Sequence, residues 1–285
     1  MNKMTAEYLF LTLDPSNIRH ATTRLERLNQ TAPVLGSQQA AEKENQQRIV
    51  LLQKTGKLRP VSLALAKRLK GCRNESPCGS VICSHCQRER NLALLKTWLP
   101  LMTAQPGYTA IMLVFNQRGP MLRSWNNMLQ ASRQISSAKQ RISRTLKRLG
   151  CSEPAIGTFS LLHHTFSSGE HEAFWLPQLC LLLPNNQALL QGLKKHMERG
   201  EGQYISTSVI NSPMSKIMLK DPIKLFKCVF DPIWHQVACT VSDEGDRLIK
   251  NTPVPLTDKV LAKSLLLLDE LGVAATTFNY CGQAK

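Results

Sequence analysis

The chain has 285 residues, of which 42% are hydrophobic, so it is long enough to bury one large core or two smaller ones. Lys and Arg number 36 against 20 Asp and Glu, and this formal net charge of +16 favours polyanionic partners such as nucleic acid. Since no apolar run approaches the roughly 18 residues of a membrane span, we expect no membrane partner.

Helical and strand patterns follow one another along the chain. Ser37 is a candidate cap for the first helix, Pro60 suits the first turn of the second, and Asp221 suits the start of a late one. The patterns predict helices over residues 38–53, 61–69, 91–101, 121–149 (as one helix or two), 187–197, 223–230 (an ambiguous apolar segment) and 260–271. Strands are expected over residues 108–115, 155–164, 179–183 and 204–210.

These elements predict an α+β fold with a central antiparallel sheet flanked by helices. A turn signal at residues 167–169 indicates that the strands on either side of it pair as a hairpin. We expect four regions: an N-terminal helical region (1–59), a helix with a cysteine-rich segment (60–105), the body that holds the sheet (106–240), and a C-terminal helical tail (241–285).

Four of the nine cysteines stand close together in sequence, as Cys72, Cys78, Cys83 and Cys86. Four thiolates can surround Zn²⁺ as a tetrahedron, and a CxxC pair supplies two of them from one tight turn, so we expect a closed structural zinc site. His85 could replace one cysteine, and unrelated buried thiols or a redox CxxC pair are the alternatives. We see no signal peptide and expect a reducing cytoplasm, in which the cysteines are thiols or metal ligands.

The basic residues are unevenly distributed, because no acidic residue occurs between Glu89 and Glu153. The helix predicted over 121–149 lies within this stretch, and its cations are candidate phosphate contacts, with a solvated helix face as the alternative. The candidate nucleic-acid-binding residues are Arg133, Lys139, Arg141, Arg144, Lys147 and Arg148.

The order of these motifs resembles that of the rolling-circle replication initiators of plasmids, which belong to the HUH endonuclease superfamily. The similarity covers roughly residues 60 to 232. It includes the cysteine cluster with the arginines that follow it, a strand that ends at Asn116 before a long helix, and a hairpin whose second strand contains Trp175-Leu176-Pro177-Gln178-Leu179-Cys180. The resemblance implies a metal-dependent DNA-nicking ancestor that acts on plasmid origins.

The residues that would bind the catalytic metal in this family are replaced. Gln178 and Cys180 stand where the family has two histidines that hold Mg²⁺ or Mn²⁺. Both positions lie on one strand face, but an amide is a neutral ligand and a thiol is soft, so neither suits those hard ions. The preceding strand offers His163 and His164 and no carboxylate, and these adjacent histidines point to opposite faces.

The nucleophile that the resemblance implies is also missing. In the segment similar to the family's tyrosine helix, Cys228 occupies the position expected for tyrosine. Tyr204 is the nearest remaining tyrosine, and nothing around it fits the family pattern. These substitutions indicate a protein that has kept the nucleic-acid-binding scaffold but not the cutting chemistry.

Three functions follow. The first is a non-catalytic DNA- or RNA-binding regulator of plasmid replication or conjugative transfer, with origin or single-stranded DNA as candidate ligands. The second is an active nicking initiator, in which Tyr204 or Cys228 attacks DNA and His163 helps to hold Mg²⁺ or Mn²⁺; a covalent adduct would identify it. The third is an inactive mimic that binds an initiator or another replication or transfer protein, which pull-down without nucleic acid would identify.

Overall fold

The computed structural model describes residues 37–56, 59–104, 107–115, 128–166, 173–199, 213–219, 221–231, 233–241, 248–250 and 253–282. The chain forms two compact units. Of the described residues, unit 1 takes those within Met1–Tyr108, Leu219–Asp231 and Asp258–Val273, and unit 2 takes those within Thr109–Met218, Pro232–Thr257 and Ala274–Lys285. Each unit therefore gathers segments that are distant in sequence.

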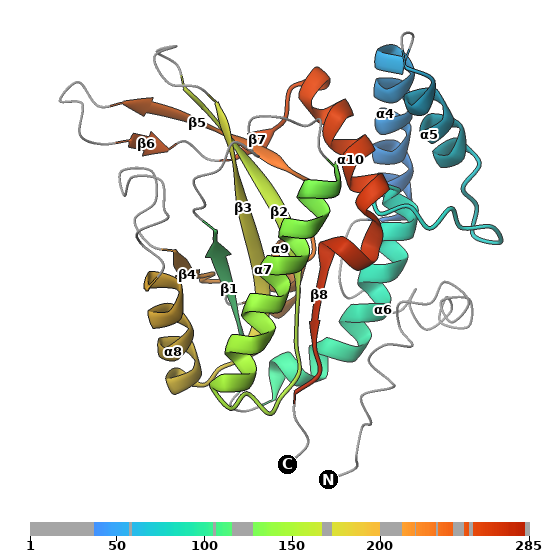
Figure 1. Ribbon diagram of the computed structural model, residues 1–285. Helices are drawn as coiled ribbons and strands as arrows, with labels where there is room; N and C mark the ends of the chain where they lie inside the picture. The colour runs from blue at the N-terminus through green and yellow to red at the C-terminus, as the bar shows by residue number, and fades with distance from the viewer. Residues whose placement is uncertain are drawn as a thin grey trace. The chain divides into compact units, whose positions relative to one another are not determined.

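The part of unit 1 that the structure describes is helical. Its elements are α4 (Gln38–Gly56), α5 (Pro60–Lys70), α6 (Ser84–Thr103), α9 (Pro222–Val229) and the first part of α10 (Asp258–Thr276). Helices α4 and α5 lie side by side, and α6 packs against α4 and α9 (Figure 1). The largest fully buried side chains in this core are Leu52, Leu69, Ile82, Leu92, Leu95, Trp98 and Phe226.

The sequence marks the starts of these helices. The Ser37 hydroxyl accepts a hydrogen bond from the Ala40 backbone N–H at 3.1 Å, and Pro60 occupies the first turn of α5. The Asp221 side chain caps α9 by accepting from the N–H groups of Ile223 and Lys224. These side chains satisfy N–H groups that the first turn of a helix leaves without an intrahelical partner.

Unit 2 contains the sheet and two helices, α7 (Met128–Arg148) and α8 (Gln187–Glu198). The strand order is β4-β1-β3-β2-β5-β6, with β7 paired to β5 and β8 paired to β2 (Figure 1). The strands are β1 (Tyr108–Val114), β2 (Ala155–Phe166), β3 (Phe174–Pro184), β4 (Met214–Lys216), β5 (His235–Val241), β6 (Leu248–Lys250), β7 (Val254–Pro255) and β8 (Thr277–Tyr280).

The fold is α+β as predicted, but the sheet is mixed. Strands β2 and β3 pair antiparallel from Ile156–Leu182 to His164–Phe174, which confirms the predicted hairpin. Strand β5 instead runs parallel to β2, so the expectation of an antiparallel sheet is wrong at this pair. The chain between β2 and β5 includes β3, α8, β4 and α9, which is long enough for the crossover that a parallel pair requires.

Most predicted elements are present, with longer bounds. Helix α6 starts at Ser84, seven residues earlier than the predicted 91, because the CxxC turn leads directly into the helix. Gly272 interrupts α10 with φ 72°, which fits the predicted helix end there, and the chain continues as β8. Strands β4 to β8 have no counterpart in the prediction. The strand predicted over 204–210 and the residues 121–127 lie outside the described part of the chain.

Candidate metal centre and basic helix

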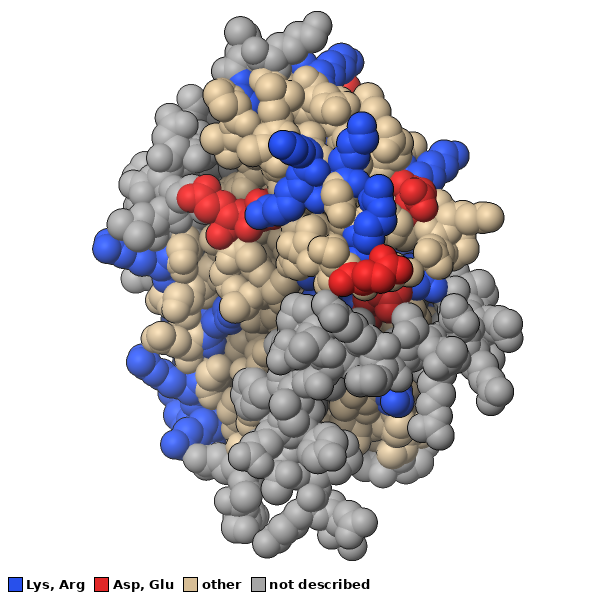
Figure 2. Space-filling model, turned by 90° about the vertical axis from the view of Figure 1, so that its right-hand side faces the viewer, with Lys and Arg blue, Asp and Glu red and all other residues tan. Residues whose placement is uncertain are grey.

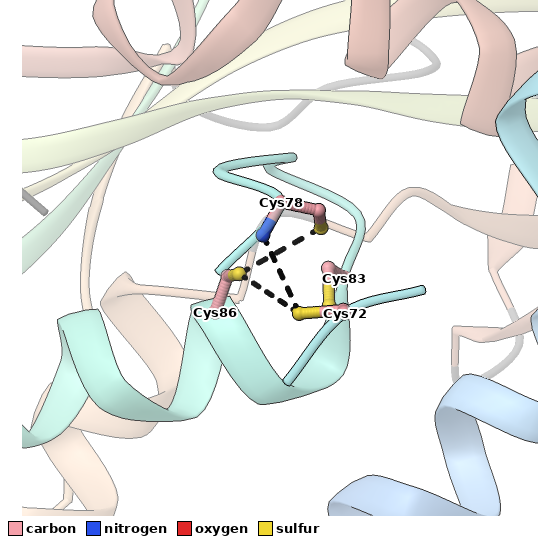
Figure 3. Close-up of side chains that lie close together, drawn as sticks. All are labelled: Cys72, Cys78, Cys83 and Cys86. Carbon is pink, nitrogen blue, oxygen red and sulfur yellow. Dashed lines mark hydrogen bonds between the residues drawn. The ribbon is translucent and has the colours of Figure 1, made fainter. Parts of the chain in front are cut away.

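The four cysteines of the predicted cluster come together in unit 1. Cys72 directly follows α5, Cys78 lies in the loop, Cys83 is the N-cap of α6, and Cys86 lies in its first turn. Gly79 takes φ 69° in this loop, a left-handed conformation that glycine adopts without strain. The four sulfur atoms lie within 4.8 Å of one another and point toward a common centre (Figure 3).

The spacing of the sulfurs matches that of a tetrahedral metal site. The Sγ atom of Cys86 lies 3.6 Å from that of Cys72 and 3.7 Å from that of Cys78. A zinc ion with Zn–S bonds of about 2.3 Å holds its sulfurs about 3.8 Å apart. Three of the cysteines are buried and Cys78 is partly exposed, and four sulfur ligands would complete a tetrahedral site without a water ligand.

The electrostatics of the cluster also favour a bound cation. Hydrogen bonds from Cys78 and Cys83 lower the pKa of Cys86 to about 2. The pKa of Cys83 is raised, because its thiol hydrogen-bonds to Cys78 and Cys86 and is buried. One thiolate is thus stabilised at the expense of its neighbours, whereas a divalent cation at the centre would allow every sulfur to ionise.

Buried and partly buried polar groups hold the loop in place. Arg48 of α4 is buried, donates to the carbonyl oxygen of Ile82 and forms an ion pair with Glu44. The Ser80 hydroxyl donates to Asp269 Oδ1 of α10 at 2.6 Å. Side chains from two separate helices therefore fix the backbone between the second and third cysteines.

A positive charge lies next to the sulfurs. The Arg90 guanidinium is within 3.3 to 3.5 Å of the carbonyl oxygens of Gly79, Ser80 and Val81. Burial lowers the pKa of Arg90, and negative charge on the cluster cysteines opposes that change. Four thiolates around a divalent ion carry a net charge of −2, which Arg90 partly compensates.

The described residues contain no other group of three or more His, Cys, Asp or Glu side chains close enough to hold a metal ion. His85 is not part of the group, so the four cysteines alone form the candidate site, as the sequence predicted. The four sulfur atoms lie close enough together to bind one metal ion, and the arrangement is compatible with structural zinc.

The hairpin positions matched to the HUH motif lie in the middle of the sheet. Gln178 and Cys180 are on β3, opposite Ser160 and Thr158 of β2, and they share one face of the strand as predicted. Gln178 is 8% exposed. No His, Asp or Glu joins these two residues in a metal-binding group within the described part of the chain.

The alternative catalytic residues occupy different settings. His163 stacks on Trp175 with ring centroids 4.4 Å apart, and burial lowers its pKa, so the imidazole is uncharged and packed at neutral pH. Cys228 is an exposed residue of α9 in unit 1. Partial desolvation by the surrounding protein and then the negative charge of Asp231 raise the pKa of its thiol, which disfavours the nucleophilic thiolate. Tyr204 lies outside the described residues.

The predicted basic helix forms as α7, which contains no acidic residue. Its candidate residues have different environments. Arg133, Arg144, Lys147 and Arg148 are exposed. Lys139 Nζ donates to the carbonyl oxygens of Ala274 and Ala275 at 2.7 and 3.1 Å, and burial lowers its pKa, so this lysine links α7 to the segment before β8.

Arg141 and Arg148 of α7 both contact His196 of α8, a residue that the sequence analysis did not select. The signal was present in sequence, because Lys194, Lys195, His196 and Arg199 form a second basic run. Lys and Arg side chains also lie on the side of the molecule that carries α4 and α5. There, Asp and Glu side chains lie beside them (Figure 2). Arg68 of α5, for example, pairs with Asp269.

Within the described residues, the helices are too short or too polar to cross a membrane. Comparisons with models of protein families, with curated proteins and with solved structures found no match to this chain.

Proposed function

We propose that this chain is a nucleic-acid-binding protein of a plasmid or other mobile element that grips phosphates through α7, and that its four-cysteine centre holds structural zinc. It would be a relative of the rolling-circle replication initiators that regulates replication or conjugative transfer without cutting DNA. Origin DNA, single-stranded DNA or RNA are the ligands that this chemistry would recognise, and replication or transfer proteins are the protein partners that such a role implies.

The arrangement of charge on α7 carries the proposal. Arg133, Arg144 and Lys147 are exposed, and the helix itself offers no carboxylate that could pair with them. Exposed cations without acidic neighbours on their own helix are available to displace the counterions of a phosphate backbone. Such contacts position nucleic acid without reading its sequence.

The proposal that the protein does not cut rests on residue types. The positions expected to bind the catalytic metal hold Gln178 and Cys180, and the position expected for the nucleophile holds Cys228, whose thiol has a raised pKa. A hard Mg²⁺ or Mn²⁺ ion has little affinity for an amide and a thiol. Phosphate contacts on a helix do not depend on any of these groups.

The test is a binding titration of the full chain with fluorescently labelled oligonucleotides at several salt concentrations. The variant Arg133→Gln/Arg144→Gln/Lys147→Gln should weaken binding about 10-fold or more near 0.15 M salt. It should also reduce the slope of log K against log salt by roughly 2 to 3, because each lost phosphate contact removes about 0.7 to 0.9. Mn²⁺ should produce neither a nicked product nor a covalent adduct.

The matched control is Lys43→Gln/Lys54→Gln/Lys96→Gln, which removes three exposed cations of unit 1 and gives the same net charge. Its affinity and salt slope should stay close to those of the wild type. If both triple variants weaken binding equally, only net charge matters and α7 is not the binding surface. A Mn²⁺-dependent adduct on Tyr204 or Cys228 would contradict the non-catalytic proposal.

A further inference from the structure

Two arginines and a histidine converge where α7 meets α8 in unit 2. Arg141 Nε donates to His196 Nε2 at 3.2 Å, and an Arg148 Nη atom lies 3.2 Å from His196 Nδ1. Arg141 and His196 are partly buried, whereas Arg148 is exposed. One imidazole ring therefore faces a guanidinium at each of its two nitrogens.

The hydrogen-bond chemistry of this group is incomplete. A neutral imidazole has a lone pair on one ring nitrogen and a hydrogen on the other. Because Nε2 accepts from Arg141, Nδ1 carries the hydrogen and points it at the N–H groups of Arg148. Two hydrogen-bond donors 3.2 Å apart do not bond to each other, but both can donate to one acceptor atom that lies within reach of the two.

The charges around the ring specify the kind of acceptor. The pKa of His196 is lowered, first by burial and then by the positive charges of Arg141, Arg148 and Arg199. The charged groups acting on the ring are thus all cations, supplied by α7 and by the end of α8. A neutral histidine beside three guanidinium groups therefore favours the binding of an anionic oxygen and disfavours the binding of a cation.

We infer that His196, Arg141 and Arg148 form a phosphate site, in which a phosphodiester oxygen accepts hydrogen bonds from His196 Nδ1 and from the Arg148 guanidinium. Arg141 acts as a positioning residue, because its bond to Nε2 selects the tautomer that donates from Nδ1. This inference rests on the proposed function and extends it, since it adds α8 to the binding surface and assigns a role to a neutral side chain.

The first experiment separates the neutral donor from the cation. With a labelled oligonucleotide, His196→Ala should raise Kd about 3- to 10-fold with little change in the salt slope, because no charge is lost. Arg148→Gln should raise Kd and also reduce the slope by about 1. His196→Gln should restore part of the affinity, since its amide can accept from Arg141 and donate to the ligand. His235→Gln, in the same unit, is the control.

The second experiment uses inorganic phosphate on the full chain labelled with ¹⁵N. Phosphate should shift the ¹⁵N signals of the His196 imidazole relative to chloride at equal ionic strength. These signals are identified as the ones that disappear in His196→Gln. Unit 2 folding of each variant is checked by its thermal unfolding.

The outcomes separate the two proposals. If the oligonucleotide binds but His196→Ala behaves like the His235→Gln control, and phosphate leaves the His196 nitrogens unmoved, this inference is overturned while the proposed function stands. If phosphate shifts His196 but no oligonucleotide binds, the oxyanion site stands and the proposed function falls, which would assign the site to a small phosphorylated ligand.

Discussion

The cysteine loop of unit 1 and the β2–β3 hairpin of unit 2 are the two regions in which the sequence suggested metal ligands, and they differ in the residues that they place there. In the loop, all four candidate ligands are cysteines and their sulfurs lie within 4.8 Å of one another. In the hairpin, the two strands pair over nine positions, while Gln178 and Cys180 offer an amide and a thiol.

The two regions depend on different residues for their stability. The loop has no regular secondary structure between α5 and α6, so we expect a bound metal to add to the support that Arg48 and Asp269 give it. The hairpin is stabilised by packing that does not involve the motif positions: Phe159 stacks on Phe115, and Trp175 contacts both His163 and Trp234. We therefore expect the hairpin to stay folded whatever residues occupy positions 178 and 180, and the loop to depend on its four cysteines.

The largest effect is therefore expected from breaking the cysteine cluster. Cys86→Ser, or removal of the metal with a chelator, should destabilise unit 1 by more than about 4 kcal/mol, because the site contributes folding free energy. Purified wild-type protein should contain one zinc ion per chain by elemental analysis. Circular dichroism at 222 nm should report a loss of helix in the variant.

The control for this prediction is Cys228→Ser, which alters an exposed thiol of the same unit outside the cluster. Its zinc content and unfolding midpoint should match those of the wild type. Wild-type protein that is free of metal and equally stable with chelator would show that the four thiols are only packed together.

Removal of a loop support should have the next largest effect. Arg48→Met leaves the buried carbonyl of Ile82 without this donor and Glu44 without its ion-pair partner, so we expect a loss of about 3 kcal/mol in urea unfolding. Zinc release to a colorimetric chelator should also become about 10-fold faster or more, because the backbone next to Cys83 loses its support. Lys43→Met, an exposed change on the same helix, should alter neither quantity.

Some of this architecture follows from sequence because local chemistry decides it. The spacing of Cys72, Cys78, Cys83 and Cys86 predicted their convergence, and Ser37, Pro60 and Asp221 marked helix starts that the structure confirms. Each of these features depends on residues within about one turn or one short loop, where the chain has few alternatives.

Other features depend on contacts between distant segments, for which the sequence has no local signal. The parallel β2–β5 pair joins residues about seventy positions apart, and β8 adds the end of the chain to the same sheet. Arg48 is an ordinary charged residue of a helix until folding brings it to Ile82. His196 likewise becomes notable only because α8 packs on α7.

A variant with two added histidines tests whether the hairpin can bind a metal ion. Gln178→His/Cys180→His places two imidazoles on one strand face, and we expect the metal-free form to lose about 1 to 2 kcal/mol of stability, because two new polar rings enter a packed sheet. Added Zn²⁺ or Ni²⁺ should raise its thermal midpoint by binding the folded state. The single variant Cys180→His should respond much less, and a wild-type hairpin that binds a second ion would contradict the comparison.

The smallest effect concerns His163, which the hairpin uses for packing rather than for metal binding. Burial lowers its pKa below the ordinary value of 6.5, so between these two values the unfolded chain binds the proton and the folded chain does not. Stability should therefore fall as the pH drops below about 6.5, until the folded-state pKa is reached. His163→Phe keeps an aromatic ring on Trp175 and should flatten the dependence of the unfolding free energy on pH. Urea titrations at pH 5.5 to 8, with zinc content monitored, measure this dependence.

His196→Gln is the comparison, because the lowered pKa of His196 acts in the same direction. If His163→Phe leaves the slope unchanged, His163 is not the packed neutral ring described above; if added Mn²⁺ removes the slope in the wild type, the hairpin binds a metal ion.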